Sequence, residues 1–173
     1  MKKILLLSLI AVVMYGCQGD RTDSPPYVFK NGVEIHLLDS DGNDMLSPDN
    51  PNKLNTDAIK VYFKVNGEYK LAEYVTTAVD RYRYGFSIST NYEDYVLALP
   101  AGAYTDENRY AATIIRWNET LSDTISCRVK TIEYETFLEY VNLNGKIVGE
   151  YGTDYENQTP MLITITHDFK MKQ

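Results

Sequence analysis

Apolar and polar residues alternate along most of the chain from Val33 onward. The clearest case is segment 59–65 (IKVYFKV), in which four apolar side chains occupy one set of alternate positions. Successive side chains of a β-strand point to opposite faces, so this pattern predicts a half-buried strand. Asn66-Gly67 follows and is typical of a type I′ turn, because both positions tolerate positive φ. Segment 68–74 is therefore expected to return as the partner strand of a hairpin.

The same alternation recurs at short intervals, cut by turn residues. Asn144-Gly145 predicts a second tight hairpin between 140–143 and 146–151. Further strands are expected at 33–37, 81–89, 95–99, 111–117, 123–129 and 163–169. The best helical candidate, 131–140, is rich in β-branched and aromatic residues and lacks a capped apolar stripe. The chain is thus expected to be all-β, an immunoglobulin-like or transthyretin-like antiparallel β-sandwich of roughly eight to ten strands.

One long segment and the N-terminus break this alternation. Segment 45–56 carries two prolines and is expected to be an irregular connection. Lys2 and Lys3 precede an apolar run at 4–15, which has the features of a secretory signal. The run is shorter than the about 20 apolar residues that a spanning helix needs. The expected organisation is a signal peptide at 1–16, a flexible tether at 17–27 and a single domain at 28–173.

The signal ends at Gly16-Cys17, which resembles the lipobox of bacterial lipoproteins. The resemblance implies cleavage before Cys17, which becomes the lipidated first residue. Met14 and Tyr15 depart from the leucine and the small residue usual in that family. The alternative is an ordinary signal peptide with an incidental cysteine. If Cys17 carries lipid, Cys127 has no partner within the chain, and the fold contains no disulfide.

Several short motifs resemble a group of Bacteroidetes lipoproteins with sandwich domains and no assigned activity. These motifs are segments 38–46, 59–69 and 141–148, and Trp117 together with 123–125. The resemblance implies a lipid-anchored protein of the cell envelope, in the outer membrane and exposed at the surface. Acidic residues soon after the cysteine act as a surface-export signal in this group, and Asp20 and Asp23 are similar to it. Asp123-Thr124-Ile125 resembles the O-glycosylation site of these bacteria, with Thr124 as the modified residue.

Charge narrows the range of partners. The chain has 17 basic and 24 acidic side chains and a formal net charge of −7. A surface that binds phosphates needs clustered Lys and Arg, and the sequence contains no such cluster. Nucleic acid is therefore excluded as an expected partner. The expected partners are the membrane, through the N-terminal lipid, and a protein or glycan ligand.

One segment has the beginning of a calcium-binding loop. Asp39, Asp41 and Asn43 provide oxygen ligands at its positions 1, 3 and 5. Asp44 stands where such a loop has glycine, and Asn50 stands where it has a bidentate glutamate. The alternative is a tight turn whose Asx side chains accept hydrogen bonds from nearby backbone. Calcium at this segment is the one cofactor the sequence suggests, and none is otherwise expected.

The remaining chemistry-bearing residues support structural roles as well as functional ones. Trp117 could stack on a sugar ring, although its place in an alternating strand favours core packing. Cys127 alternates with apolar neighbours and is expected in the core. His36 and His167 lie on separate expected strands, and neither has a neighbour in sequence at metal-ligand spacing.

Carboxylate pairs are frequent, but their adjacency in sequence does not set the separation that a glycosidase requires. The pairs are Glu133 with Glu135, Glu93 with Asp94, and Asp106 with Glu107. The sequence therefore favours a non-enzymatic binding or interaction module of unidentified ligand, anchored by lipid to the cell envelope. Carbohydrate binding is the first alternative, and glycan hydrolysis is the second.

Overall fold

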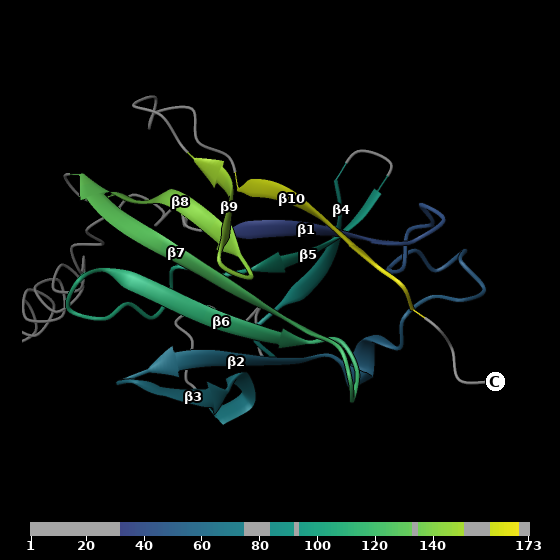
Figure 1. Ribbon diagram of the computed structural model, residues 1–173, viewed down its shortest axis with the longest axis horizontal. Helices are drawn as coiled ribbons and strands as arrows, with labels where there is room; N and C mark the ends of the chain where they lie inside the picture. The colour runs from purple at the N-terminus through teal and green to yellow at the C-terminus, as the bar shows by residue number, and fades with distance from the viewer. Residues whose placement is uncertain (1–31, 75–83, 92–93, 133–134, 151–159, 170–173) are drawn as a thin grey trace, which may run out of the picture.

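The strands of the protein form two stacked β-sheets (Figure 1). The computed structural model describes residues 32–74, 84–91, 94–132, 135–150 and 160–169. These ranges contain ten strands and two single-turn 3-10 helices, which confirms the expected all-β antiparallel sandwich. No helix in them has the length and apolar character needed to cross a bilayer. The expected signal peptide, Cys17 and the tether lie outside the described residues.

The smaller sheet has four strands in the order β10-β1-β5-β4. Its strands are β1 (Val33–Asp39), β4 (Ser87–Asn91), β5 (Asp94–Leu99) and β10 (Met161–His167). β1 pairs with β10 in parallel and with β5 in antiparallel fashion. Strands close to the two ends of the described chain therefore lie side by side at one edge of this sheet.

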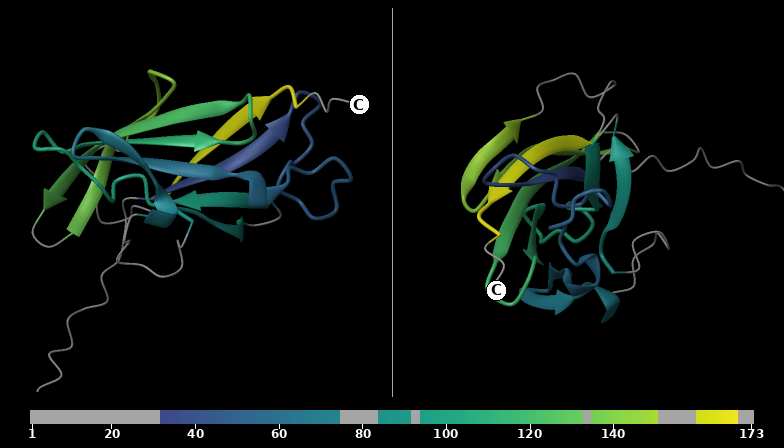
Figure 2. Two further views of the ribbon diagram at one scale, coloured as in Figure 1. Left: turned by 90° about the horizontal axis from the view of Figure 1, so that it is seen from below. Right: turned by 90° about the vertical axis from the view of Figure 1, so that its right-hand side faces the viewer.

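The larger sheet has six strands in the order β3-β2-β6-β7-β8-β9, and every neighbouring pair is antiparallel. Its strands are β2 (Lys60–Val65), β3 (Glu68–Leu71), β6 (Tyr110–Arg116), β7 (Ser122–Ile132), β8 (Glu135–Leu143) and β9 (Lys146–Glu150). β9 and β10, which end their respective sheets, lie next to one another (Figure 2). The two sheets therefore approach each other along this edge.

Both Asn-Gly hairpins form, but the returning strand expected at 68–74 ends at Leu71 and is followed by the single turn η3 (Ala72–Tyr74). Asn66 and Gly67 have φ values of 53° and 87°, and Asn144 and Gly145 have φ values of 51° and 84°. Positive φ at both central residues is the type I′ geometry, whose twist matches that of the flanking strands. The local turn chemistry therefore sets the register of β2 with β3 and contributes to that of β8 with β9.

The core consists of alternate side chains from the two sheets. Ile35 and Leu37 of β1 face Val61, Ile115 and other residues of the larger sheet in one continuous apolar cluster. Burying one such side chain contributes roughly 1.5–3 kcal/mol. The apolar faces predicted from the alternation at 33–37, 59–65, 111–117 and 123–129 all contribute buried residues to this core.

The strand predicted at 81–89 is wrong for residues 84–86. β4 begins at Ser87, and Gly85 has a φ of 84°, which bends the chain just before it. A Cβ atom at Gly85 would lie 2.5 Å from the Cβ of Ala72, so the backbone approaches the core here more closely than a side chain allows. Tyr84 consequently points outward and is 56% exposed. Residues 81–83 lie outside the described ranges.

The connection from β1 to β2 is irregular, as its prolines indicate. Its only helical turn is η2 (Thr56–Ala58), and Asn55 accepts a hydrogen bond from the Asp57 N–H at its start. Met45 and Leu46 are buried and anchor the segment to the core. This anchoring fixes the position of Asp44, which precedes them.

Candidate metal centre

His36 lies on the outer face of the four-stranded sheet. Val33, Ile35 and Leu37 of β1 point into the core, so the alternate residue His36 points away from it. His36 is paired in register with Val96 of β5. Asp94 precedes Val96 by two residues and so occupies the same face of the sheet. The register of β1 with β5 therefore places an imidazole beside a carboxylate.

A second carboxylate reaches His36 from the connection that follows β1. The chain reverses at 39–43, and Asp44 returns to form a bridge with Leu38. Asp44 Oδ1 accepts hydrogen bonds from the backbone N–H groups of Leu46 (2.8 Å) and Ser47 (3.2 Å). Its Oδ2 accepts a hydrogen bond of 3.0 Å from the Tyr95 N–H. These three bonds hold the carboxylate in one orientation beside β5.

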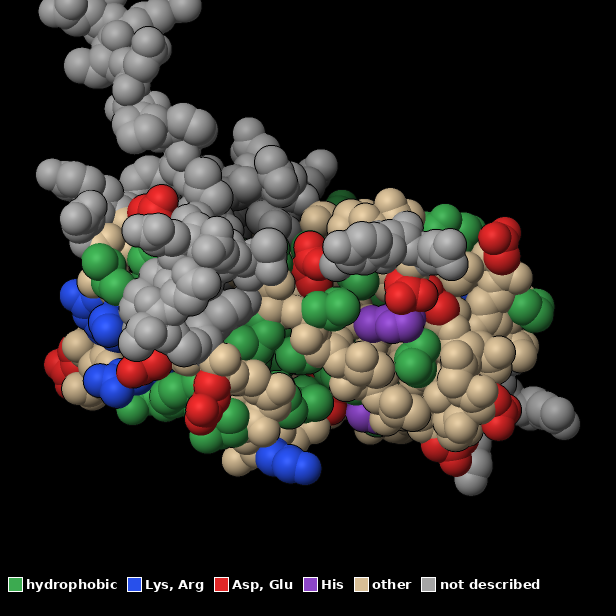
Figure 3. All heavy atoms as spheres, turned by 90° about the horizontal axis from the view of Figure 1, so that it is seen from above, with side chains coloured by type: hydrophobic (Ala, Val, Ile, Leu, Met, Phe, Trp, Pro, Cys, Tyr) green, Lys and Arg blue, Asp and Glu red, His purple; other side chains and the backbone are tan. Residues whose placement is uncertain are grey.

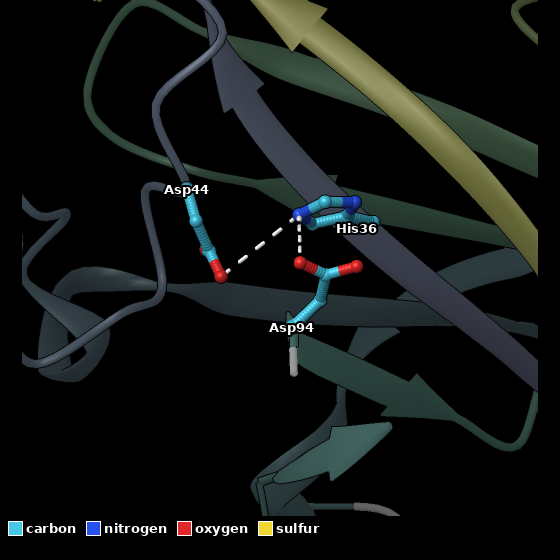
Figure 4. Close-up of side chains that lie close together, drawn as sticks. All are labelled: His36, Asp44 and Asp94. Atoms are coloured by element: carbon cyan, nitrogen blue, oxygen red, sulfur yellow. Dashed lines mark ion pairs between the residues drawn. The ribbon is translucent and has the colours of Figure 1, made fainter. Parts of the chain in front are cut away.

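The three side chains converge on one point, as Figure 4 shows. We call His36, Asp44 and Asp94 the His36 cluster. His36 Nε2 lies 3.9 Å from Asp44 Oδ2 and 3.8 Å from Asp94 Oδ1. The His36 and Asp44 side chains are 16% and 17% exposed, whereas Asp94 is 57% exposed. The cluster is thus fixed on its inner side and open to solvent on the side of Asp94.

The face seen in Figure 3 shows the two histidines of the chain in purple, the larger purple area directly beside acidic side chains in red. Within the described ranges, the His36 cluster is the one group of three His, Cys, Asp or Glu residues whose ligand atoms lie within 4.8 Å of one another. An imidazole nitrogen and two carboxylate oxygens are ligands that divalent metal ions accept. The geometry is therefore that of a candidate metal centre with open coordination positions.

The residues expected as calcium ligands lie in a hydrogen-bonded turn. Asp39 Oδ1 accepts hydrogen bonds from the N–H groups of Asp41 and Asn43, and Asp39 Oδ2 accepts one from the Asn43 side-chain amide. Gly42 adopts a φ of 83° to complete the reversal. The hydrogen bonds from Asn43 hold the pKa of the Asp39 carboxyl below its ordinary value. Asp39, Asp41 and Asn43 thus form the hydrogen bonds of the turn that was the alternative, and calcium binding there stays a prediction. Asp44, placed beside this turn, contributes to the His36 cluster.

A second group of polar side chains lies between the sheets. Asp123 is only 2% exposed, and we call it and its partners Trp117, Asn144 and His167 the Asp123 network. Asp123 Oδ2 accepts a hydrogen bond of 2.6 Å from Trp117 Nε1, and His167 Nε2 lies 2.5 Å from the same oxygen. Asp123 Oδ1 accepts a hydrogen bond of 2.6 Å from the Asn144 amide. Each oxygen of this buried carboxylate is therefore paired, as buried charge requires.

Trp117 cannot serve as the sugar-stacking residue that the sequence allowed. Its exposed fraction is 0%, its ring belongs to the core cluster, and its only polar atom is bonded to Asp123. The reason is that Trp117 follows directly on the inward-facing positions of β6, so the ring packs between the sheets. Trp117 therefore packs in the core, the position that the alternation of apolar and polar residues favoured.

Two further sequence candidates lie on β7. Thr124 is half-buried on the outer face, where its N–H donates to Asn144 Oδ1. Its expected O-glycosylation stays a prediction. Cys127 is buried and 1% exposed, and burial raises the pKa of the Cys127 thiol to about 12. The thiolate needed for nucleophilic chemistry is therefore not formed at neutral pH, and the core position expected for Cys127 is confirmed.

The carboxylate pairs considered for hydrolysis have different surroundings. Asp106 Oδ1 accepts hydrogen bonds from the N–H groups of Asn108 and Tyr110, so it shapes the turn before β6. Glu93 and Glu133 lie outside the described residues. Asp94 belongs to the His36 cluster. A surface cleft of about 510 Å³ lies elsewhere, between the start of β4 and the η2 turn, where Tyr84, Phe86 and Ile59 contribute its apolar lining.

Comparisons with known proteins do not extend this picture. No family model, no curated protein and no solved structure matches the chain. The function of the protein is therefore inferred from its residues and their geometry.

The two polar groups differ in whether the sequence signals them. Asp123 is a charged residue on the face that Ile125, Cys127 and Val129 also occupy, and a charge at an inward position is a visible signal of a buried network. The His36 cluster has no such signal, because its members come from β1, the following connection and β5. The register of β1 with β5 and the turn that returns Asp44 to Leu38 bring them together.

Proposed function

We propose that this chain is a lipid-anchored protein of the cell envelope whose sandwich domain acts as a non-enzymatic binding or interaction module. The observation that carries the proposal is Gly16-Cys17 at the end of a short apolar run, followed by a polar, proline-ended segment. The sequence places a short flexible tether, 17–27, between Cys17 and the domain. Such an arrangement holds a folded domain close to a membrane surface.

The described part of the domain supports binding over catalysis. The carboxylate of Asp123 is fully hydrogen-bonded to structural partners, and the Cys127 thiol is buried and protonated. A general acid or base must have access to the proton that it transfers. Neither group has that access. Surface-accessible chemistry is concentrated instead at the His36 cluster, whose ligand atoms are suited to binding an ion.

The anchor can be tested by growing producing cells with a palmitate label and separating membranes from soluble fractions. We expect the wild-type chain to incorporate label and to sediment with membranes, and the Cys17→Ala chain to lose both properties. Cys127→Ala is the matched control, because it removes the other cysteine of the chain, which is buried in the core. A Cys17→Ala chain that remains labelled and membrane-bound would refute the proposal.

The side of the membrane on which the domain lies can be tested separately. We propose that the domain faces the outside of the outer membrane, as Asp20 and Asp23 after the cysteine suggest by resemblance. Intact cells treated with a membrane-impermeant amine reagent should label the wild-type chain. A chain with Asp20→Asn and Asp23→Asn should keep its lipid and lose most of this labelling. Equal labelling of the two chains would contradict the role of these residues, and no labelling of wild type would place the domain on the inner side.

A further inference from the structure

His36 has a buried nitrogen that no hydrogen bond satisfies. Among the described residues, Nε2 of His36 is out of contact with solvent and has no hydrogen-bond partner. Its two nearest carboxylate oxygens lie at 3.8 and 3.9 Å, beyond hydrogen-bonding distance. Buried polar atoms in folded proteins nearly always have a partner. Thr113 Oγ1 is also without one among the described residues, but His36 Nε2 lies beside two carboxylates, where a bound cation would complete it. We propose that the His36 cluster binds a divalent transition-metal cation, with Zn²⁺ as the best fit.

The separations between the ligand atoms agree with this assignment. Two ligands about 2.1 Å from one zinc ion at a tetrahedral angle lie about 3.4 Å apart. The three atoms of the His36 cluster are within 4.8 Å of one another, and two of the separations are below 4 Å. These two separations, both from His36, exceed the zinc value by about half an ångström. Asp94 can close the difference at its own contact with His36, because its side chain is the most exposed of the three.

The charges also favour a cation. The Asp44 and Asp94 carboxylates are held close together, and Asp44 cannot turn away because three backbone N–H groups hold it. Two like charges at this separation repel each other, and a cation between them replaces the repulsion by attraction. Asp44 thus acts as a fixed ligand and Asp94 as an adjustable one.

The imidazole decides which cations are favoured. Ca²⁺ and Mg²⁺ prefer oxygen ligands and bind few nitrogen ligands in proteins. Zn²⁺ accepts imidazole and carboxylate together, with bond lengths close to 2.1 Å. Three protein ligands leave at least one position for water or an external group, as in zinc sites that are open to a ligand. The inference gives a ligand class to the proposed binding module and in that sense rests on it, although the site itself does not require the lipid.

The experiment measures zinc binding by the full chain in detergent, carrying Cys17→Ser so that no exposed thiol competes for the metal. Isothermal titration with ZnCl₂ should give one site per chain. Thermal unfolding with zinc at a hundredfold excess over its dissociation constant should raise Tm by at least about 5 °C relative to buffer with chelator. The palmitate experiment tests the anchor independently, so failure of either claim leaves the other measurable.

Matched variants locate the site. Asp94→Asn and His36→Gln should each weaken zinc binding by at least about tenfold, since even outer-sphere changes in metal sites cost about 10–100-fold. Asp41→Asn, in the exposed turn beside the site, and His167→Gln, at the only other histidine, should leave the affinity unchanged. Asp94 is more than half exposed, whereas Asp44 is held by three backbone N–H groups, so the Asp94 variant tests the ligand without disturbing the segment that holds Asp44.

Spectroscopy of the imidazoles identifies which histidine binds the metal. Nitrogen-15 spectra of the imidazole should show a zinc-dependent change at Nε2 of His36 and none at His167. The proposal is overturned if zinc leaves Tm and the His36 signals unchanged, or if the His36 and Asp94 variants bind zinc as tightly as the parent. A calcium response as large as that of zinc would overturn the choice of metal class.

Discussion

The two histidines of this protein stand beside aspartates in opposite circumstances. His167 belongs to the Asp123 network, where the carboxylate is 2% exposed and each of its oxygens lies within 2.6 Å of a side-chain nitrogen. His36 belongs to the His36 cluster, where the nearest carboxylate oxygens are 3.8 and 3.9 Å away. The first group is closed by hydrogen bonds, and the second leaves a space between its polar atoms.

This difference separates a stabilising group from a binding group. A buried carboxylate that has lost its water stabilises a fold only when hydrogen bonds replace that water. The Asp123 network satisfies that condition and joins β6, β7, β10 and the β8–β9 turn. In the His36 cluster, Nε2 of His36 has no hydrogen bond, and the two nearest carboxylate oxygens are too far away to accept one. Polar groups that are costly for the free fold are typical of sites that a ligand completes.

The largest expected change in stability comes from removing the central carboxylate of the Asp123 network. Asp123→Ala leaves Trp117 Nε1, which is fully buried, and the Asn144 amide and His167 Nε2 without their acceptor. We expect a loss of about 3–5 kcal/mol in the free energy of unfolding, as for a buried charged group whose partner is removed. Urea unfolding followed by tryptophan fluorescence measures it, since Trp117 is the only tryptophan. A loss below about 1 kcal/mol would show that the network does not stabilise the fold.

The two Asn-Gly turns provide a matched pair for the next largest effect. Asn66 and Asn144 have nearly the same positive φ, but only Asn144 is a member of the network, through Asp123 and Thr124. Replacing each by Ala costs the same backbone strain. Asn144→Ala should therefore destabilise the protein by about 2 kcal/mol more than Asn66→Ala, the cost of unsatisfied buried partners. Equal unfolding midpoints for the two variants would contradict a structural role for the Asn144 side chain.

The same turns show how far the sequence predicts the fold. Asn-Gly pairs and alternation act within a few residues, so the hairpins of β2 with β3 and of β8 with β9 followed directly from local chemistry. Gly85 shows the opposite case. Its φ of 84° is needed because the backbone packs against Ala72 and Val61, and a local pattern carries no information about that contact. The strand predicted across 84–86 was wrong for this reason.

The two polar groups also differ in how far the sequence predicts them. Alternation through β7 placed Cys127 in the core correctly, and it also placed the charge of Asp123 there, where a network could have been expected. The His36 cluster depends on the pairing of His36 with Val96 and on the turn that returns Asp44 to Leu38. Both are tertiary relations between segments distant in sequence. The spacing of Asp39, Asp41 and Asn43 suggests a calcium ion, but spacing carries no information about the approach of Asp44 to His36.

Substitutions of the two histidines test the same comparison with a smaller expected change in the free energy of unfolding. His167→Gln removes one hydrogen-bond partner of Asp123 and the edge contact with Phe169, whereas His36→Gln removes a nitrogen that has no hydrogen bond. We expect His167→Gln to cost about 1.5 kcal/mol and His36→Gln at most about 0.5 kcal/mol in metal-free buffer. Urea unfolding in the presence of a chelator measures both. The reverse order would mean that His36 is the structural residue of the pair.

The smallest expected change in the free energy of unfolding is that of Asp94→Asn. The sign of this change distinguishes a metal ligand from a structural residue. In metal-free buffer Asp94→Asn removes one of two carboxylates that lie close together, and the residue is more than half exposed. The free energy of unfolding should therefore change by less than about 0.5 kcal/mol, toward higher stability. With saturating zinc the order should reverse, because the parent gains binding energy that the variant lacks. A structural carboxylate would lose stability in both buffers, as we expect for Asp123, whereas a ligand loses it only when the metal is present. The sign change at Asp94 on adding zinc is thus the measurement that distinguishes the two kinds of aspartate.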